Sequence, residues 1–180
     1  MAKDEESEIL VIEDNKKKIR IIICAIVLIL FLVIIIWGII NRDKFKNFGA
    51  DMVLNNYAKS YINLDERKYC GVLPEEIIKK SYESKDKCND AMKKMFNDVK
   101  NNKQELTSYE VKDNDEVSSE EFKSITMDLD RNYGISSKDV KKIVRYSLSF
   151  SYKDNDNKKD VKVYIAKINN KWFVVDQKMV

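Results

Sequence analysis

The chain has 180 residues with only 4 glycines and 1 proline, so it is long enough for one modest domain plus a membrane anchor. It contains no histidine, which excludes Ser-His and Cys-His nucleophile systems and removes the commonest metal ligand. A net charge of +3, spread along the sequence, does not indicate nucleic-acid binding.

The N-terminal region contains the strongest pattern in the sequence. Residues 1–18 form an acidic tail that we expect to be disordered and cytoplasmic. From Ile21 to Ile40 the chain is uncharged and strongly apolar, and a helix of this length spans about 30 Å, the thickness of the bilayer interior. The sequence therefore predicts a transmembrane signal anchor over residues 19–41. A buried soluble helix or a cleaved signal peptide fits less well, because the run is apolar on every side and ends in a poor cleavage context.

The orientation of the anchor follows from charge and from cysteine. Basic residues lie on both sides of the apolar run: Lys16, Lys17, Lys18 and Arg20 before it, and Arg42, Lys44 and Lys46 after it. The cluster before the run favours a cytoplasmic N-terminus. Cys70 and Cys88 form a pair outside the membrane, which suits an oxidising compartment. We therefore expect a single-pass protein of the cell membrane with an extracytoplasmic domain over residues 44–180.

Helical patterns dominate the first part of that domain. A first helix carries an apolar stripe, and its pattern is typical of a helix that a sheet covers on several sides: Leu54, Tyr57, Ala58 and Tyr61. A short second helix opens at Leu73-Pro74-Glu75-Glu76. A third runs from about residue 86 to 101, with its methionines expected in the core, and a fourth runs from the capping box at Ser118 to Gly134.

Strand patterns dominate the remainder. Residues 106–112 predict a strand followed by a polar turn at Asp113-Asn114-Asp115, and residues 144–152 alternate strictly between apolar and polar side chains. After a polar loop at residues 154–160, the segment 161–165 and the segment 172–175 predict two more strands joined at Asn169-Asn170. The fold class is therefore α+β, with helices followed by an antiparallel sheet.

The closing hairpin carries a family resemblance. Ala166-Lys167 and Lys171-Trp172 form an aliphatic-Lys-x-x-x-Lys-Trp pattern, and Leu64-Asp65 ends the first helix in a matching way. Together with the order of elements over residues 45–180, this resembles the nuclear transport factor two-like (cystatin-like) superfamily, and especially the small extracytoplasmic domains of Gram-positive bacteria. The resemblance implies a sheet curved into a cone around the first helix. The superfamily is functionally diverse, so fold analogy alone does not select an activity.

Enzymes of this superfamily place acids and tyrosines inside the cone. By resemblance, the candidates for the cavity of this chain are Tyr61, Asp65, Tyr69, Tyr146, Phe150 and Trp172. No motif connects them, and tyrosines commonly pack with their hydroxyls at the edge of a core. Asp154-Asn155-Asp156-Asn157 begins like a calcium loop but lacks its later Gly and Glu, so we expect a solvated hairpin loop. We expect neither a metal nor a cofactor.

Cys70 and Cys88 lie at the end of the first helix and the start of the third. Two states fit this placement equally well: a disulfide that joins two helices, or two buried free thiols.

These observations favour a membrane-anchored binding or scaffold module over an enzyme. Its partners would be the membrane and a protein of the cell envelope, with no nucleic acid, and the resemblance makes an assembly subunit of a conjugation or secretion machine a reasonable expectation. The alternative is a protein or enzyme that holds a small apolar ligand in the cone.

Overall fold

The computed structural model describes residues 26–36, 47–153 and 157–180, and the chain divides into two units, Met1–Lys46 and Asn47–Val180. In the first unit, residues 26–36 are helical, and their large apolar side chains are each 45–64% exposed. None of the helices within the described residues is both long enough and apolar enough to cross a membrane. Both ends of the predicted span, residues 21–25 and 37–40, lie outside the described residues, as does the tail over residues 1–18.

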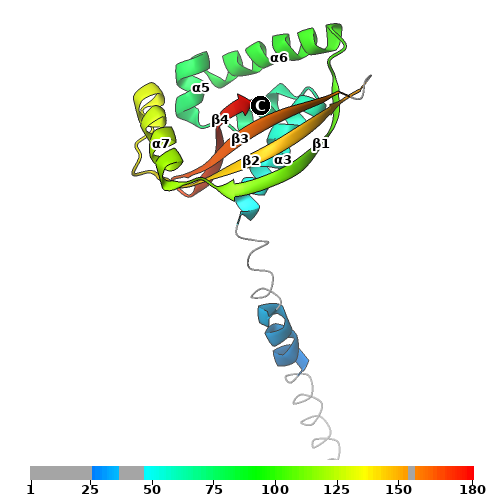
Figure 1. The fold of residues 1–180 in the computed structure, drawn as a ribbon. Coiled ribbons are helices and arrows are strands. Elements are labelled where there is room, and N and C mark those ends of the chain that lie inside the picture. Colours follow the sequence, from blue (N-terminus) through cyan, green and yellow to red (C-terminus); the bar gives the residue numbers. More distant parts are fainter. Residues whose placement is uncertain (1–25, 37–46, 154–156) are drawn as a thin grey trace, which may run out of the picture. The chain divides into compact units, whose positions relative to one another are not determined.

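We call the second unit the folded domain. Its described residues form five helices and four strands: four helices come first, then β1, the fifth helix and the last three strands (Figure 1). In chain order they are α3 (Phe48–Ile62), α4 (Glu66–Gly71), α5 (Glu75–Tyr82), α6 (Lys85–Asn101), β1 (Leu106–Glu116), α7 (Ser119–Tyr133), β2 (Val140–Tyr152), β3 (Lys158–Ile168) and β4 (Lys171–Met179). The predicted α+β class, with helices before an antiparallel sheet, is confirmed.

The sheet has the order β1-β2-β3-β4, and every neighbouring pair is antiparallel. The strict alternation of β2 explains its central place, because it supplies one apolar face and one mostly polar face. On the apolar face Tyr146 lies opposite Val163 and Leu148 lies opposite Val161, and all four side chains are buried. Asn169 and Asn170 both adopt positive φ in the turn between β3 and β4, as the sequence predicted.

Two buried clusters cover the two faces of the sheet. The larger cluster joins α3, α4 and α6 to the inward side chains of β2 and β3, including Val144, Tyr146 and Leu148. The smaller cluster joins α7 to the alternate side chains, including Ile143 and Tyr164. Because residues 143 and 144 point to opposite faces, α3 and α7 lie on opposite sides of the sheet.

The two edges of the sheet differ in how they are covered. On β4, the amide of Val174 donates to the carbonyl oxygen of Val72 (2.9 Å), so a neighbouring segment protects that edge. On β1, almost every residue is exposed, and two register shifts interrupt its pairing with β2, at Leu106/Ser108 and at Val111/Asp113. An irregular, charged edge is a poor template for another strand.

Two local predictions need correction, and one helix was missed. Asp113-Asn114-Asp115 is not a turn but part of β1, because long β2 provides partners for it and Arg145 forms an ion pair with Asp115 (3.7 Å). Residues 158–160, expected in a loop, belong to β3, where Asp160 pairs with Lys112 (3.0 Å). The separate helix α4 was not predicted, since six residues carry too little periodicity to detect.

Candidate binding groove

Two adjoining depressions lie at one end of the sheet, between its inward face and helices α3 and α6. The first has a volume of about 100 Å³ and the second about 130 Å³. Both are lined by Tyr61, Leu106 and Lys159. Because they share these walls, we treat them as one surface, the binding groove.

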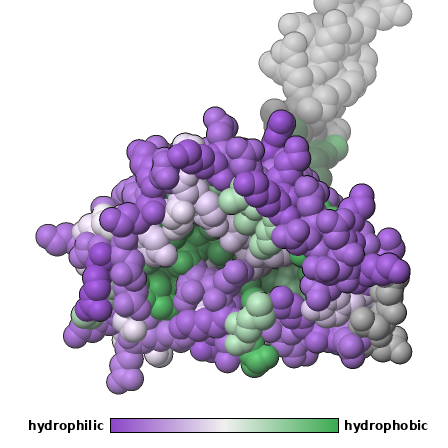
Figure 2. Space-filling view, turned by 90° about the horizontal axis from the view of Figure 1, so that it is seen from above, coloured by the Kyte–Doolittle hydropathy of each residue, from purple (hydrophilic) through white to green (hydrophobic). Residues whose placement is uncertain are grey.

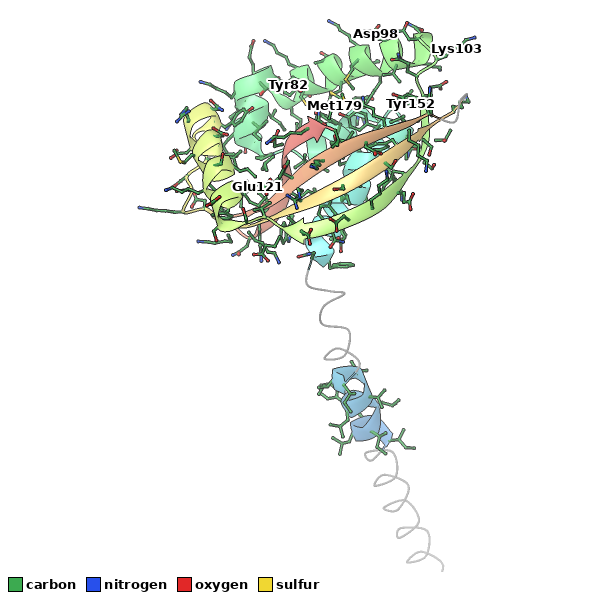
Figure 3. All side chains as sticks on the ribbon, in the orientation of Figure 1. Tyr82, Asp98, Lys103, Glu121, Tyr152 and Met179 are labelled. Carbon is green, nitrogen blue, oxygen red and sulfur yellow. A yellow bond between two sulfur atoms is a disulfide. The ribbon has the colours of Figure 1, made fainter. Side chains whose placement is uncertain are left out.

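Each depression also has walls of its own. The first is completed by Tyr57, Phe150, Val161, Gln177 and Met179. The second is completed by Leu64, Met95, Phe96, Val99, Gln104 and Tyr152. Figure 2, seen from above, shows hydrophobic surface lying within a hydrophilic rim on that face of the folded domain. In Figure 3, Tyr152 and Met179, which end β2 and β4, lie beneath α6 on that side. The groove is thus mainly apolar.

Aromatic rings form the wall on the side of α3. Tyr61 lies at the centre of this cluster, with ring centroids 5.2 Å from Tyr57, 5.6 Å from Tyr69, 5.8 Å from Phe96 and 6.2 Å from Phe150. Three of these four contacts are edge-to-face, the arrangement that the ring quadrupoles favour. The cluster therefore fixes the shape of the groove wall before any ligand binds.

One polar group lies inside this apolar surface. The side-chain oxygen of Gln177 accepts a hydrogen bond from the Tyr57 hydroxyl and a longer one from the Tyr61 hydroxyl (3.4 Å). Burial raises the pKa of Tyr57 well above its ordinary value, and burial also raises the pKa of Tyr61. Both phenols therefore stay protonated at neutral pH, so they serve as hydrogen-bond donors and not as general bases.

Lys159 is the cation of the groove. It lies opposite Phe150 in the β2–β3 pairing, and it shares its face with Val161 and Val163. Those two valines are buried in the core, so Lys159 occupies an inward position that is apolar further along the strand. Within the described part of the chain, Lys159 forms no ion pair. An ammonium group without an ion-pair partner among the described residues therefore borders both depressions.

The structure brings together only part of the predicted cavity. Tyr61 and Phe150 line the groove, and Tyr69 contacts Tyr61 from behind. The other three predicted residues, Asp65, Tyr146 and Trp172, do not line either depression.

Each of these three has a structural role elsewhere. Asp65 is the N-cap of α4 and accepts from the amide of Lys68 (2.9 Å). The Tyr146 hydroxyl donates to Asp51 (2.7 Å). Trp172 packs against Gly49.

Several groove residues were missed by reasoning from the sequence. Tyr57 was expected only as part of the apolar stripe of the first helix, while Lys159 and Gln177 were not singled out. A signal for Lys159 and Gln177 does exist. Each is a polar residue at a strand position whose side chain, by the alternation of the strand, must point towards the core. Met95 was expected in the core, yet it lines the second depression, whereas Met92 is buried as predicted.

A larger hollow of about 510 Å³ lies beside α5, and its lining mixes apolar side chains with charged ones. Its rim carries Glu75 and Lys79, which pair with each other (2.7 Å) and are both highly exposed. Cys70 also borders it and forms a disulfide with Cys88, one of the two states that the sequence left open. The disulfide joins α4 to α6 and is buried, so it serves to hold these helices together.

The described residues hold no group of His, Cys, Asp or Glu side chains that could bind a metal ion. The groove offers apolar contacts, the side-chain amide of Gln177 and the positive charge of Lys159. The chain matches no known family model, and no curated protein or solved structure is detectably similar to it.

Proposed function

We propose that this chain is a single-pass membrane protein whose folded domain acts on the extracytoplasmic side as a binding or scaffold module of a cell-envelope complex. The observation that carries the proposal is the helical run over residues 26–36, where every side chain is large, apolar and at least 45% exposed. Water is a poor solvent for such a surface, whereas a bilayer interior covers it completely.

The length of the apolar run supports a span. The described helical residues belong to a longer uncharged sequence from Ile21 to Ile40. As a helix it would extend for about 30 Å, and each Ile, Leu, Val or Phe near its centre favours insertion by roughly 0.3–0.6 kcal/mol. The sum over such a run is several kcal/mol in favour of the membrane.

The disulfide supports the orientation. Disulfides persist in oxidising compartments and are rare in a reducing cytosol. The bond between Cys70 and Cys88 thus favours an extracytoplasmic domain, in agreement with the basic residues that precede the apolar run.

The architecture is compatible with the nuclear transport factor two-like superfamily, in which a sheet curves around the first helix. Here α3 contacts β1, β3 and β4, so one helix lies across much of the sheet. Membrane-tethered domains of that superfamily act as assembly subunits, which fits a module with a groove and a tether. Assignment to the superfamily remains part of this proposal.

Fractionation and protease accessibility together test the proposal. The full chain should stay in the membrane pellet after alkaline carbonate washing, and protease added to intact cells should degrade the folded domain. A variant with Lys16, Lys17 and Lys18 changed to Gln should show a larger protected fraction, because the charge bias is weaker. Recovery of intact, unaggregated chain in the aqueous fraction would contradict the anchor, and full protection of the wild-type domain would contradict its orientation.

A further inference from the structure

We infer that the groove binds an extended segment of a partner protein, which inserts two large apolar side chains and presents a carboxylate to Lys159. The inference rests on the proposed function as a binding module and names the ligand class of its groove. Three features of the groove carry it: the sizes of the depressions, the placement of Lys159 and the amide nitrogen of Gln177.

The sizes of the depressions favour side chains over a small molecule. Pockets for small molecules usually have about 300–1,000 Å³, whereas an apolar cavity of about 150 Å³ holds a single benzene ring. The two depressions have about 100 and 130 Å³, somewhat less than that cavity, so each accommodates one aliphatic group of the size of a Leu or Met side chain. Two such sites that share a wall fit two residues of one peptide.

The charge of the groove predicts that the ligand carries a carboxylate. Lys159 borders both depressions and has no ion-pair partner within the described residues, so it is the cation that an acidic ligand in this groove would meet. By contrast, Lys112 of β1 and Lys153, which follows β2, already pair with Asp160 and Glu105. A ligand carboxylate between or beside the two apolar side chains would therefore meet Lys159.

Gln177 favours a peptide over an acyl chain. Its side-chain oxygen accepts from Tyr57 and Tyr61, so its amide nitrogen is the end that remains to donate, and it has no partner within the described residues. A peptide offers a backbone carbonyl to that nitrogen at every residue, whereas the chain of a fatty acid offers none. An acyl chain would leave this polar group without a hydrogen bond in an apolar site.

The experiment uses the full chain in phosphatidylcholine nanodiscs. A random nine-residue peptide library is selected on it, with empty nanodiscs as the counter-selection. The enriched peptides should contain two large apolar residues and at least one Asp or Glu. In fluorescence anisotropy, Lys159→Glu should weaken binding of such a peptide by roughly tenfold, because it replaces an attraction with a repulsion. Replacing the acid of the peptide with Lys should restore binding to the Lys159→Glu chain.

A matched control separates the groove from general charge effects. Lys171→Glu makes the same change of charge at the opposite end of the sheet, at the exposed first residue of β4, and should leave binding unchanged. Leu106→Ala removes part of the shared wall and should weaken binding of every selected peptide. Equal thermal unfolding of Lys159→Glu and wild type would confirm that the lost binding is not lost folding.

Several results would overturn the inference. In the selection, these are the absence of any enriched peptide or the enrichment of peptides that lack an acid. In the binding assays, they are equal peptide affinity of Lys159→Glu and wild type, or tighter binding of sodium dodecanoate than of the peptides. Self-association of the chain that Lys159→Glu abolishes would also overturn it. The nanodisc assay also separates this inference from the proposed function. A chain that inserts but binds no peptide refutes only the groove, while a chain that stays in water and binds the peptides refutes only the tether.

Discussion

Gly49 of α3 lies directly against the indole of Trp172 on β4. A Cβ atom at position 49 would lie 2.4 Å from Trp172 Cδ1 and 2.6 Å from its Nε1, closer than real carbon atoms approach. The absence of a side chain at Gly49 therefore sets how closely the first helix of the folded domain approaches the last strand.

Gly49→Ala should destabilise the folded domain. The gain in helix propensity of up to about 1 kcal/mol is smaller than the overpacking cost of roughly 1–3 kcal/mol, so we expect a net loss of about 1 kcal/mol in denaturant unfolding. Gly71→Ala is the matched control, because a Cβ there has no atom within 4 Å, and its stability should be equal or slightly higher. Trp172→Leu combined with Gly49→Ala should lose less than the two single changes added together; strict additivity would contradict the clash.

Loss of the disulfide should weaken the same domain more strongly. Cys70 and Cys88 are 18 positions apart, and closing a loop of that size restricts the unfolded chain by about 3 kcal/mol. Changing both residues to Ala should lower the free energy of unfolding by roughly that amount. Reduction of the wild-type protein should give a similar loss. An unchanged unfolding midpoint under reducing conditions would show that the bond contributes nothing to stability.

Asp65 predicts a stability change in acid. The backbone amide of Lys68 donates to its carboxylate and lowers its pKa below the ordinary value. A lowered pKa means that the stabilisation is present above the unfolded value of about 3.9 and is lost as the pH falls through the folded one. Asp65→Ala should cost about 1 kcal/mol at pH 7, and the difference from wild type should shrink below about pH 4. A difference that stays constant with pH would argue against the charged cap.

The buried tyrosines predict a loss of stability at high pH. Burial raises the pKa of Tyr57, Tyr61, Tyr69 and Tyr146, in each case as the largest cause. Since their folded pKa values exceed the unfolded value of about 10, their contribution is complete below pH 10 and is lost as the pH rises further. The domain should therefore unfold cooperatively in alkali, together with the absorbance change of phenolate formation. Tyr69→Phe should make this pH dependence less steep, and early titration of all tyrosines in the folded state would contradict the burial.

The order of elements could be predicted because local signals agreed with the tertiary structure. Ser118 accepts from the amide of Glu121 and starts α7, and Gly134, with φ of 71°, ends it, as the capping pattern indicated. The second half of the capping box does not form. Glu121 instead accepts from the Tyr164 hydroxyl (2.9 Å) and pairs with Arg145 (3.2 Å), because folding brings the sheet within its reach.

The groove could not be predicted in the same way, because it depends on pairing between distant strands. Gln177 contacts Tyr57 although the two residues are 120 positions apart in the sequence, and a local sequence pattern does not predict such a distant contact. Asp65 shows the opposite case, in which a local structural role was overlooked. Its position at the end of the first helix resembled a catalytic placement, but an acid before a new helix is equally the usual N-cap, and α4 was too short to be recognised.

The uneven edge of β1 has a consequence for crowding. A protein confined to a membrane meets its own copies far more often than the same number of molecules in solution, so any regular open strand would favour stacking of sheets into aggregates. The two breaks in the register of β1 and its exposed charged side chains remove that regularity. If the chain is tethered to a membrane as proposed, crowding on that surface would therefore not favour pairing of sheets through β1.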